Sequence, residues 1–206
     1  MASKTSSSST VKKSSGVFKK LEIVNTSLVK SSVRRGIRQL VREQYPEEKL
    51  SNEQFDELFP LKCKLNVYKC KKNVQLIANE NVPLFFNVRG GYFLPTLRVL
   101  HQFPTLLSPW QVDEGAIRFV LAGANIMAPG FTSEGGLKNE VRSVKNVKLN
   151  VGDPVAIYAE DRKHALAVGF ALKSSDEIIE DPKGLAVENL HYISDELWMR
   201  QTLADE

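Results

Sequence analysis

The feature that most constrains the fold is the break around Pro104 and Pro109, where neither a helical nor a strand pattern can continue. Before the break, apolar residues recur at helical and then at strand spacing. After it, short apolar runs are separated by glycine-rich corners. A chain of 206 residues has room for two small domains. We therefore expect a tail over residues 1–16 and domains over residues 17–107 and 108–206.

The first domain combines helices and strands. Apolar residues at helical spacing predict a helix over residues 26–45 that begins near Thr26 and is stopped by Pro46. Shorter helices are expected after Asn52 and before Pro104, and strands at residues 61–70, 73–78 and 82–88. The residues expected to face inward from the first helix are Leu28, Val29, Val33, Ile37, Leu40, Val41 and Tyr45.

The second domain consists mostly of short strands. They are predicted at residues 117–121, 154–159, 165–172 and 185–193, with a helical turn beginning at Ser174 and a Gly/Pro-rich loop over residues 123–130. This spacing is typical of a small, partly closed barrel. The predicted fold class is α+β, with a small N-terminal α/β domain followed by a pseudo-barrel of mostly short β-strands.

Composition excludes several classes of protein. No apolar run approaches the ~18 residues that span a bilayer, and no apolar leader core precedes a cleavage site. Two cysteines cannot build a disulfide framework, so we expect a reducing, cytoplasmic compartment. Residues 1–16 hold seven Ser and three Lys without an acid, which predicts a disordered tail. A transit peptide and a phosphate-contacting tail are the alternatives.

The charge is divided between the two halves. Residues 1–107 hold 18 Lys and Arg against 8 Asp and Glu, a balance of +10. Residues 108–206 hold 10 against 16, a balance of −6. Attraction to phosphate should therefore concentrate in the first half. The second half has a net negative charge, so it would have to engage RNA through local contacts rather than through its overall charge.

Two basic patches in the first half are candidates for contact with ribosomal RNA phosphates. One follows the polar face of the first helix, and the other lies between two strands, where a hairpin tip can reach a phosphate. The alternative for the helix is an ordinary solvated face. The candidate phosphate contacts are Arg34, Arg35, Arg38, Lys71 and Lys72.

The chain carries no familiar catalytic motif. It has no phosphate-binding loop, no G-x-S-x-G and no H-E-x-x-H. Cys63, Cys70 and three scattered histidines do not have the spacing of a zinc site, so we predict no metal and no cofactor. Asp113 is expected to hydrogen-bond its own turn before Gly115. We therefore expect a protein that is not an enzyme.

The segment VDEGAIRFVLAGANIMAPG, residues 112–130, is the most distinctive in the chain. Gly123, Ala124 and Gly130 lack bulk, so the backbone of a partner could approach closely. Asn125 offers an amide that can both donate and accept hydrogen bonds. The alternative is a tight barrel corner that needs small residues for its own packing.

This segment, with GDPVAIYAE, HALAVGFALKSSDEI and GLAVENLHYISDELW, resembles a PUA domain, the pseudo-barrel shared with RNA pseudouridine synthases and archaeosine transglycosylases. GVFKK, REQYP and LFFNVRGGYFLPTLRVLHQFP extend the likeness. Over residues 17–200 the chain is similar to the malignant-T-cell-amplified-sequence family, translation machinery-associated PUA proteins. Residues 1–16 precede the family's usual start, and residues 134–148 depart from its usual loop.

The resemblance implies a non-catalytic, RNA- and ribosome-binding translation factor without a zinc site of its own. It implies a density-regulated-protein partner with an SUI domain, and action on the small ribosomal subunit in tRNA release or recycling, reinitiation and non-standard initiation. The candidate RNA-binding residues are Phe119, Gly123, Ala124, Asn125, Met127 and Gly130. Phe119 is expected either to stack on a base or to lie in the core. A ribosome-biogenesis protein and an accessory subunit of an RNA-modifying enzyme are the alternatives.

Overall fold

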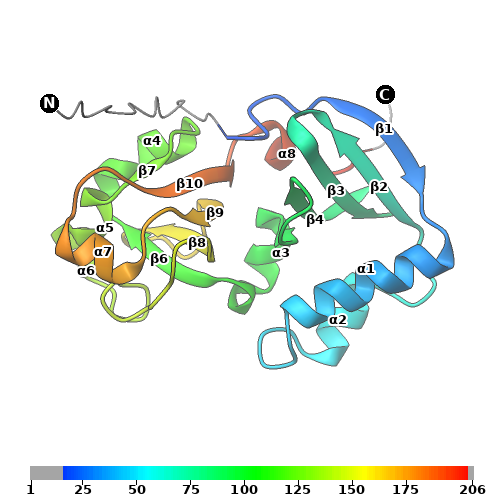
Figure 1. Cartoon of the computed structure of the whole chain (residues 1–206), viewed down its shortest axis with the longest axis horizontal. Helices are drawn as coiled ribbons and strands as arrows, with labels where there is room; N and C mark the ends of the chain where they lie inside the picture. The colour runs from blue at the N-terminus through cyan, green and yellow to red at the C-terminus, as the bar shows by residue number, and fades with distance from the viewer. Residues whose placement is uncertain (1–15, 204–206) are drawn as a thin grey trace, which may run out of the picture.

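A computed structural model describes residues 16–203, which form two β-sheets with helices packed around them (Figure 1). The first sheet takes its strands from residues 23–95 and the second from residues 108–192. The expected α+β class, with a curled, barrel-like second half, is confirmed. The predicted tail lies outside the described residues except for Gly16, whose N–H donates to the carbonyl of Gly123.

The first sheet is a fully antiparallel meander in the order β1-β2-β3-β4-β5. Because β1 lies at its edge, one side of that strand has no neighbour in the sheet. The strands are β1 (Ile23–Leu28), β2 (Leu65–Cys70), β3 (Val74–Asn79), β4 (Val82–Val88) and β5 (Leu94–Pro95). The helical segments are α1 (Ser31–Gln44), α2 (Asn52–Leu58), η1 (Lys71–Asn73), α3 (Leu97–Gln102) and η2 (Pro104–Leu106).

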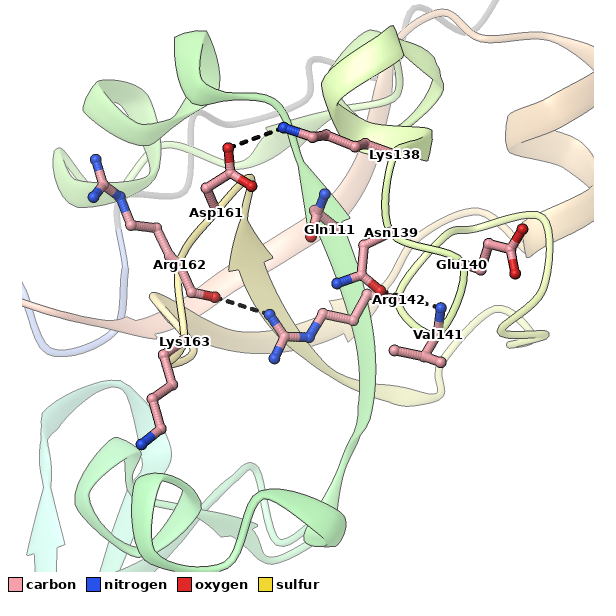
Figure 2. A pocket seen from close by; sticks show the side chains of 9 residues that line it. All are labelled: Gln111, Lys138, Asn139, Glu140, Val141, Arg142, Asp161, Arg162 and Lys163. Carbon is pink, nitrogen blue, oxygen red and sulfur yellow. Dashed lines mark hydrogen bonds and ion pairs between the residues drawn. The ribbon is translucent and has the colours of Figure 1, made fainter.

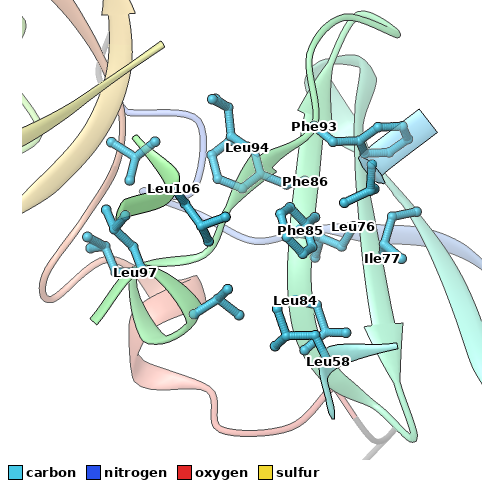
Figure 3. Close-up of a cluster of buried hydrophobic side chains, with 14 of the residues drawn as sticks. Leu58, Leu76, Ile77, Leu84, Phe85, Phe86, Phe93, Leu94, Leu97 and Leu106 are labelled. Carbon is cyan, nitrogen blue, oxygen red and sulfur yellow. The ribbon is translucent and has the colours of Figure 1, made fainter. Parts of the chain in front are cut away.

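Local caps fix two of these helices. Ser51 and Gln54 form a reciprocal capping box at the start of α2, and the Thr96 hydroxyl accepts from the N–H of Val99 at the start of α3. The capped helices then cover the sheet with apolar side chains. Figure 3 shows Leu58 of α2 and Leu97 of α3 gathered beside residues of β4 and β5.

The second sheet has the order β6-β8-β9-β10-β7, with β6 and β8 parallel and the other pairs antiparallel. Its strands are β6 (Ser108–Val112), β7 (Ile126–Met127), β8 (Pro154–Ala159), β9 (Ala167–Ala171) and β10 (Leu185–Tyr192). Around it lie η3 (Glu114–Ala116), α4 (Ile117–Leu121), α5 (Pro129–Thr132), α6 (Glu134–Leu137), α7 (Ser175–Glu180) and α8 (Glu196–Met199). Ser174 caps α7 as predicted.

The two halves are joined by a shared apolar core. The ring of Phe18 packs edge-on against Phe86 at 5.0 Å and against His191 at 5.6 Å, measured between ring centroids. The end of the chain also returns to the first half, because the N–H of Leu203 donates to the carbonyl of Asn81 at 2.8 Å. Contacts of this kind fix the two halves relative to each other.

The prediction for the start of the first helix was wrong. Residues 23–28 form the edge strand β1, and α1 begins only at Ser31. Ile37, Val41 and Tyr45 are buried as expected, but Leu28, Val33 and Leu40 are about half or more exposed. β-branched and small polar residues in IVNTSL favour a strand, and Thr26 and Ser27 belong to it rather than capping a helix.

The prediction of a strand at residues 117–121 was also wrong, because this segment is the helix α4. Asp113 begins the helical run, since its carboxylate accepts from the N–H of Ala116 at 2.9 Å. Gly123 ends it with a φ of +78°. A five-residue apolar run has no distinguishing period, so its caps decide its structure. The expected role of Asp113 in its own turn is confirmed.

The break expected at Pro104 and Pro109 contains regular structure, because η2 begins at Pro104 and Pro109 lies within β6. Several other bounds also differ from those expected. The strand predicted from residue 61 begins at Leu65, and residues 61–62 form a turn. The strand predicted at 165–172 covers Ala167–Ala171. The loop at 123–130 contains the two-residue strand β7 and the start of α5.

Candidate nucleic-acid interface

The segment that the sequence singled out presents an exposed apolar surface on α4 and the residues after it. The side chain of Phe119 is 54% exposed and that of Met127 is 48% exposed, while Ala124 is also open to solvent. Exposure at this level rules out a core position for Phe119. The Arg118 guanidinium lies 4.6 Å from the centre of the Phe119 ring. An exposed ring beside a guanidinium is a common platform for stacking a nucleic-acid base.

The other three candidates of this segment lie inward. Gly123 is buried, and a Cβ at that position would lie 2.7 Å from the Tyr192 hydroxyl and 2.8 Å from its ring. The Asn125 side-chain oxygen accepts from the N–H of Asn189 at 3.1 Å. Gly130 is half-buried, and a Cβ there would lie 3.6 Å from atoms of Val112 and Ala116. Gly123 and Asn125 thus make contacts within the chain itself, whereas a Cβ at residue 130 would make only ordinary van der Waals contacts.

Asn189 organises this corner, and the sequence did not single it out. Its side-chain amide donates to the carbonyls of Val120 and Ala124 at 3.0 and 3.1 Å, and it is fully buried. It therefore fixes the end of α4 and the following loop against β10. A polar residue within the apolar strand LAVENLHY was the available signal, since buried amides are usually hydrogen-bonded.

The basic face of α1 is largely engaged within the molecule. Arg34 donates to the carbonyl of Cys63 at 2.9 Å. Arg38 forms a 2.8 Å ion pair with Asp56, and its guanidinium lies 4.8 Å from the ring centre of Phe55. These contacts hold α1 against α2 and the turn before β2. Arg35 is exposed and has no side-chain hydrogen bond or ion pair among residues 16–203.

The second basic patch is at the turn between β2 and β3. Lys71 is exposed and forms an ion pair with Glu22, whose pKa is lowered chiefly by that hydrogen bond. Lys72 is exposed, has a φ of +62°, and its Nζ lies 3.5 Å from the carbonyl of Val17. Both side chains are exposed at this hairpin, but the ammonium group of Lys71 is paired with Glu22, whereas that of Lys72 has no carboxylate partner among residues 16–203.

One buried pair has the composition of an acid–base dyad. His191 Nδ1 lies 2.8 Å from Asp195 Oδ2, and both side chains are almost fully buried. Asp195 also accepts from the N–H groups of Tyr192 and Trp198, and the His191 ring lies against Phe18 and Phe86. With these partners the pair acts as a structural clamp at the junction of the two halves.

No metal centre is evident in the part of the chain that the structure describes. No group of three or more His, Cys, Asp or Glu residues within it could hold an ion. Cys63 is buried and Cys70 is half-buried, and both are free thiols. No helix within residues 16–203 has the length and apolar character needed to cross a membrane.

Two domain families match the chain in sequence. A Pre-PUA-like domain matches residues 18–104, and a PUA domain matches residues 110–193. The PUA domain is a kind of domain that binds RNA. The chain is 38% identical to Malignant T-cell-amplified sequence 1-B of Xenopus laevis over 190 residues, which is 90% of this chain and 99% of that protein.

Two further relatives and one solved structure show a similar likeness. The Drosophila melanogaster homologue of Malignant T-cell-amplified sequence 1 is 41% identical over 187 residues, covering 88% of this chain and 97% of that one. Human Malignant T-cell-amplified sequence 2 is 37% identical, covering 90% of this chain and 99% of the human protein. A Pyrococcus horikoshii hypothetical protein has a TM-score of 0.61 at 21% identity, covering 86% of this chain and 99% of that one, and shares the fold.

Proposed function

Because the chain belongs to the malignant T-cell-amplified sequence family, we propose that it is a non-enzymatic RNA-binding translation factor acting on the small ribosomal subunit. In this proposal the PUA domain engages tRNA, and the chain works in the cytoplasm with an SUI-domain partner of the density-regulated kind. The complex would act in tRNA release and recycling, in reinitiation and in non-standard initiation.

The observation that carries the proposal is the exposed Phe119 ring on a PUA domain. The Phe119 ring is 54% exposed on a short helix whose helical run is capped at its start by Asp113, so a base can reach the face of the ring. The neighbouring Arg118 supplies positive charge beside the ring. The small, exposed residue Ala124 keeps the surface beside α4 low, so that an RNA strand can pass.

The mechanism is positional. Binding of the PUA domain to tRNA or ribosomal RNA holds the partner near the tRNA site and changes which tRNA is retained. No bond is made or broken by the chain in this scheme. The buried His191–Asp195 pair fits the scheme, because its hydrogen bonds are all made within the fold.

A partner is supported by the unpaired edge of the first sheet. β1 exposes Val24 and Leu28, which are 66% and 65% exposed. An edge strand with apolar side chains is a surface that another chain can cover. We propose that the SUI-domain partner covers it. Substituting Leu28→Glu should then reduce capture of the partner without lowering the thermal stability.

The experiment is a reconstituted assay with purified small subunits, the full chain and its partner. Co-sedimentation measures binding, and labelled deacylated tRNA measures release. Phe119→Ala should slow tRNA release roughly 5- to 150-fold, because stacking on one base contributes ~1–3 kcal/mol. Met199→Ala, at another exposed apolar residue, is the matched control.

Two outcomes would contradict the proposal. If the wild-type chain neither binds mature small subunits nor changes tRNA release, it is not a factor of this kind. Sedimentation with nucleolar precursors instead would favour the ribosome-biogenesis alternative. If only Phe119→Ala is without effect, α4 is not the tRNA surface, and Ala124→Asp should be equally harmless.

A further inference from the structure

A second candidate site lies on the PUA domain between the loop after α6 and the turn joining β8 to β9. It is an open hollow of about 630 Å³ (Figure 2). Its lining residues are Gln111, Lys138, Asn139, Glu140, Val141, Arg142, Asp161, Arg162 and Lys163. The hollow is large enough for about one nucleotide. None of these residues belongs to the exposed surface of α4.

The loop side of the hollow is fixed by β6. The N–H of Gln111 donates to the carbonyl of Arg142 at 2.9 Å, and the buried Gln111 side chain donates to the carbonyl of Gly135 at 2.7 Å. Lys138 ties the loop to the opposite turn through ion pairs of 3.0 Å with Asp161 and 3.1 Å with Glu160. Those bonds, the one to Asp161 first, raise the pKa of Lys138.

Arg142 lines the hollow, and two contacts within the chain fix its side chain. Its guanidinium lies 3.9 Å from the ring centre of Tyr158, and one of its N–H groups donates to the carbonyl of Arg162 at 2.8 Å. Since a guanidinium has five N–H donors, most of them stay available. A stacked and hydrogen-bonded guanidinium loses little conformational freedom when it binds an anion.

The charges of the hollow oppose those of the domain around it. Four Lys and Arg against Glu140 and Asp161 give the lining a balance of +2, in a half of the chain with a balance of −6. Among residues 16–203, no carboxylate lies within ion-pair distance of Arg142, Arg162 or Lys163. Because these three cations line one hollow and are not neutralised there, their charge is available to an anionic ligand.

We propose that this hollow binds the sugar–phosphate backbone of an RNA strand. The inference rests on the proposed RNA-binding function and adds a second contact site to it. Figure 2 shows the charged ends of Arg142, Arg162 and Lys163 pointing to different places rather than converging on one point. That arrangement suits successive phosphates of a polyanion better than a single phosphate group.

The test is a binding titration of the full chain with a fluorescein-labelled 20-nucleotide single-stranded RNA over a series of salt concentrations. The variant is Arg162→Glu with Lys163→Glu, at two exposed side chains without side-chain hydrogen bonds in the described structure. The control is Lys183→Glu with Arg200→Glu, which makes the same change in net charge at exposed positions outside the hollow.

The hollow variant should bind the RNA about 25-fold more weakly at 0.1 M salt, because two phosphate contacts are lost. For the same reason the slope of log K against log salt should fall by ~1.4, at ~0.7 per contact with a single strand. The control should change both far less. Equal losses in the two variants would overturn the proposal, since net charge alone would explain them.

Three further outcomes distinguish failure of this proposal from failure of the proposed function. If the wild type binds RNA and the hollow variant binds it equally well, the hollow is not an RNA-binding site, and the proposed function still stands. Unchanged RNA binding together with lost capture of the SUI-domain partner would assign the hollow to an acidic protein surface instead. A wild-type chain that binds neither this RNA nor small subunits would overturn the proposed function itself.

Discussion

Substituting Gly123→Ala should destabilise the protein through a contact with its own chain. Gly123 has a φ of +78°, and an added Cβ would lie 2.7 Å from the Tyr192 hydroxyl. An alanine in this left-handed conformation costs about 1–2 kcal/mol. Moving a buried ring such as Tyr192 adds about 1–3 kcal/mol, as other overpacked sites do. The expected loss is therefore about 2–5 kcal/mol.

The chain provides a matched control for the backbone part of this cost. Gly184 has a φ of +75°, close to that of Gly123, and a Cβ added there would meet nothing within 4 Å. Gly184→Ala should therefore cost only the ~1–2 kcal/mol of the left-handed conformation. The difference between the two variants isolates the contact with Tyr192.

Denaturant unfolding followed by circular dichroism measures both free energies. Thermal unfolding should show Gly123→Ala melting roughly 4–20 °C below the wild type, at 2–4 °C per kcal/mol for a chain of this size. In a Tyr192→Leu background, the cost of Gly123→Ala should fall to that of Gly184→Ala. Equal costs for the two glycines in the wild-type background would refute the reasoning. Lost RNA binding with unchanged stability would show that Gly123 serves a ligand.

Three further predictions follow from the titratable and charged groups. Lys71→Glu with Lys72→Glu should weaken small-subunit binding and lower its salt slope by ~1–2, and an unchanged affinity across a salt series would remove this turn from the interface. Burial raises the pKa of Cys70 to about 11, so its thiolate fraction at pH 8 should be ~100-fold below that of a thiol with the usual value of 9.0. The measurement is the rate of alkylation by iodoacetamide in a Cys63→Ala background, which leaves Cys70 as the single thiol. A rate equal to that of a free cysteine would contradict the prediction. Burial lowers the pKa of His101, so the folded protein binds fewer protons there than the unfolded chain does. The contribution of His101 to the free energy of unfolding should be fully present above pH ~6.5 and should be lost as the pH falls below that value. In urea titrations at pH 7.5 and 5.5, His101→Gln should weaken this pH dependence.

The parts of the fold that the sequence predicts well have local determinants. Ser174 and Glu177 form the capping box at the start of α7, and Thr96 caps α3. The strand at residues 82–88 is bounded by turn residues at both ends. Such elements depend on neighbours within four residues, so one sequence suffices to find them.

The errors have two different causes. IRFVL is too short to show a period, and the neighbouring caps at Asp113 and Gly123 decide that it is a helix. The other error occurs where a distant residue decides the structure. Leu28 fits a helical pattern, but pairing of residue 28 with Asn66 places it in a strand. The period of a short apolar segment cannot show which distant strand it will meet.

The same reasoning applies to the candidate site. Arg38 belongs to a basic stripe in the sequence, but only the docking of α2 shows that Asp56 and the ring of Phe55 hold it. Gly123 could open the surface to a ligand or admit a side chain of the chain itself, and Tyr192, 69 positions away, shows that it admits the ring. Side-chain exposure thus separates Phe119 from Gly123, which motif spacing cannot do.

The division of charge along the chain does not translate directly into a division of RNA contacts. Part of the +10 of the first half is used within the fold, because Arg34 and Arg38 hold α1 to its neighbours. The acidic second half keeps Arg142, Arg162 and Lys163 free of carboxylate partners among residues 16–203. A cation contributes to phosphate binding only when its own chain leaves it unneutralised and accessible. By that criterion the two halves are more alike than their net charges suggest, because each keeps exposed basic side chains without a carboxylate partner among residues 16–203.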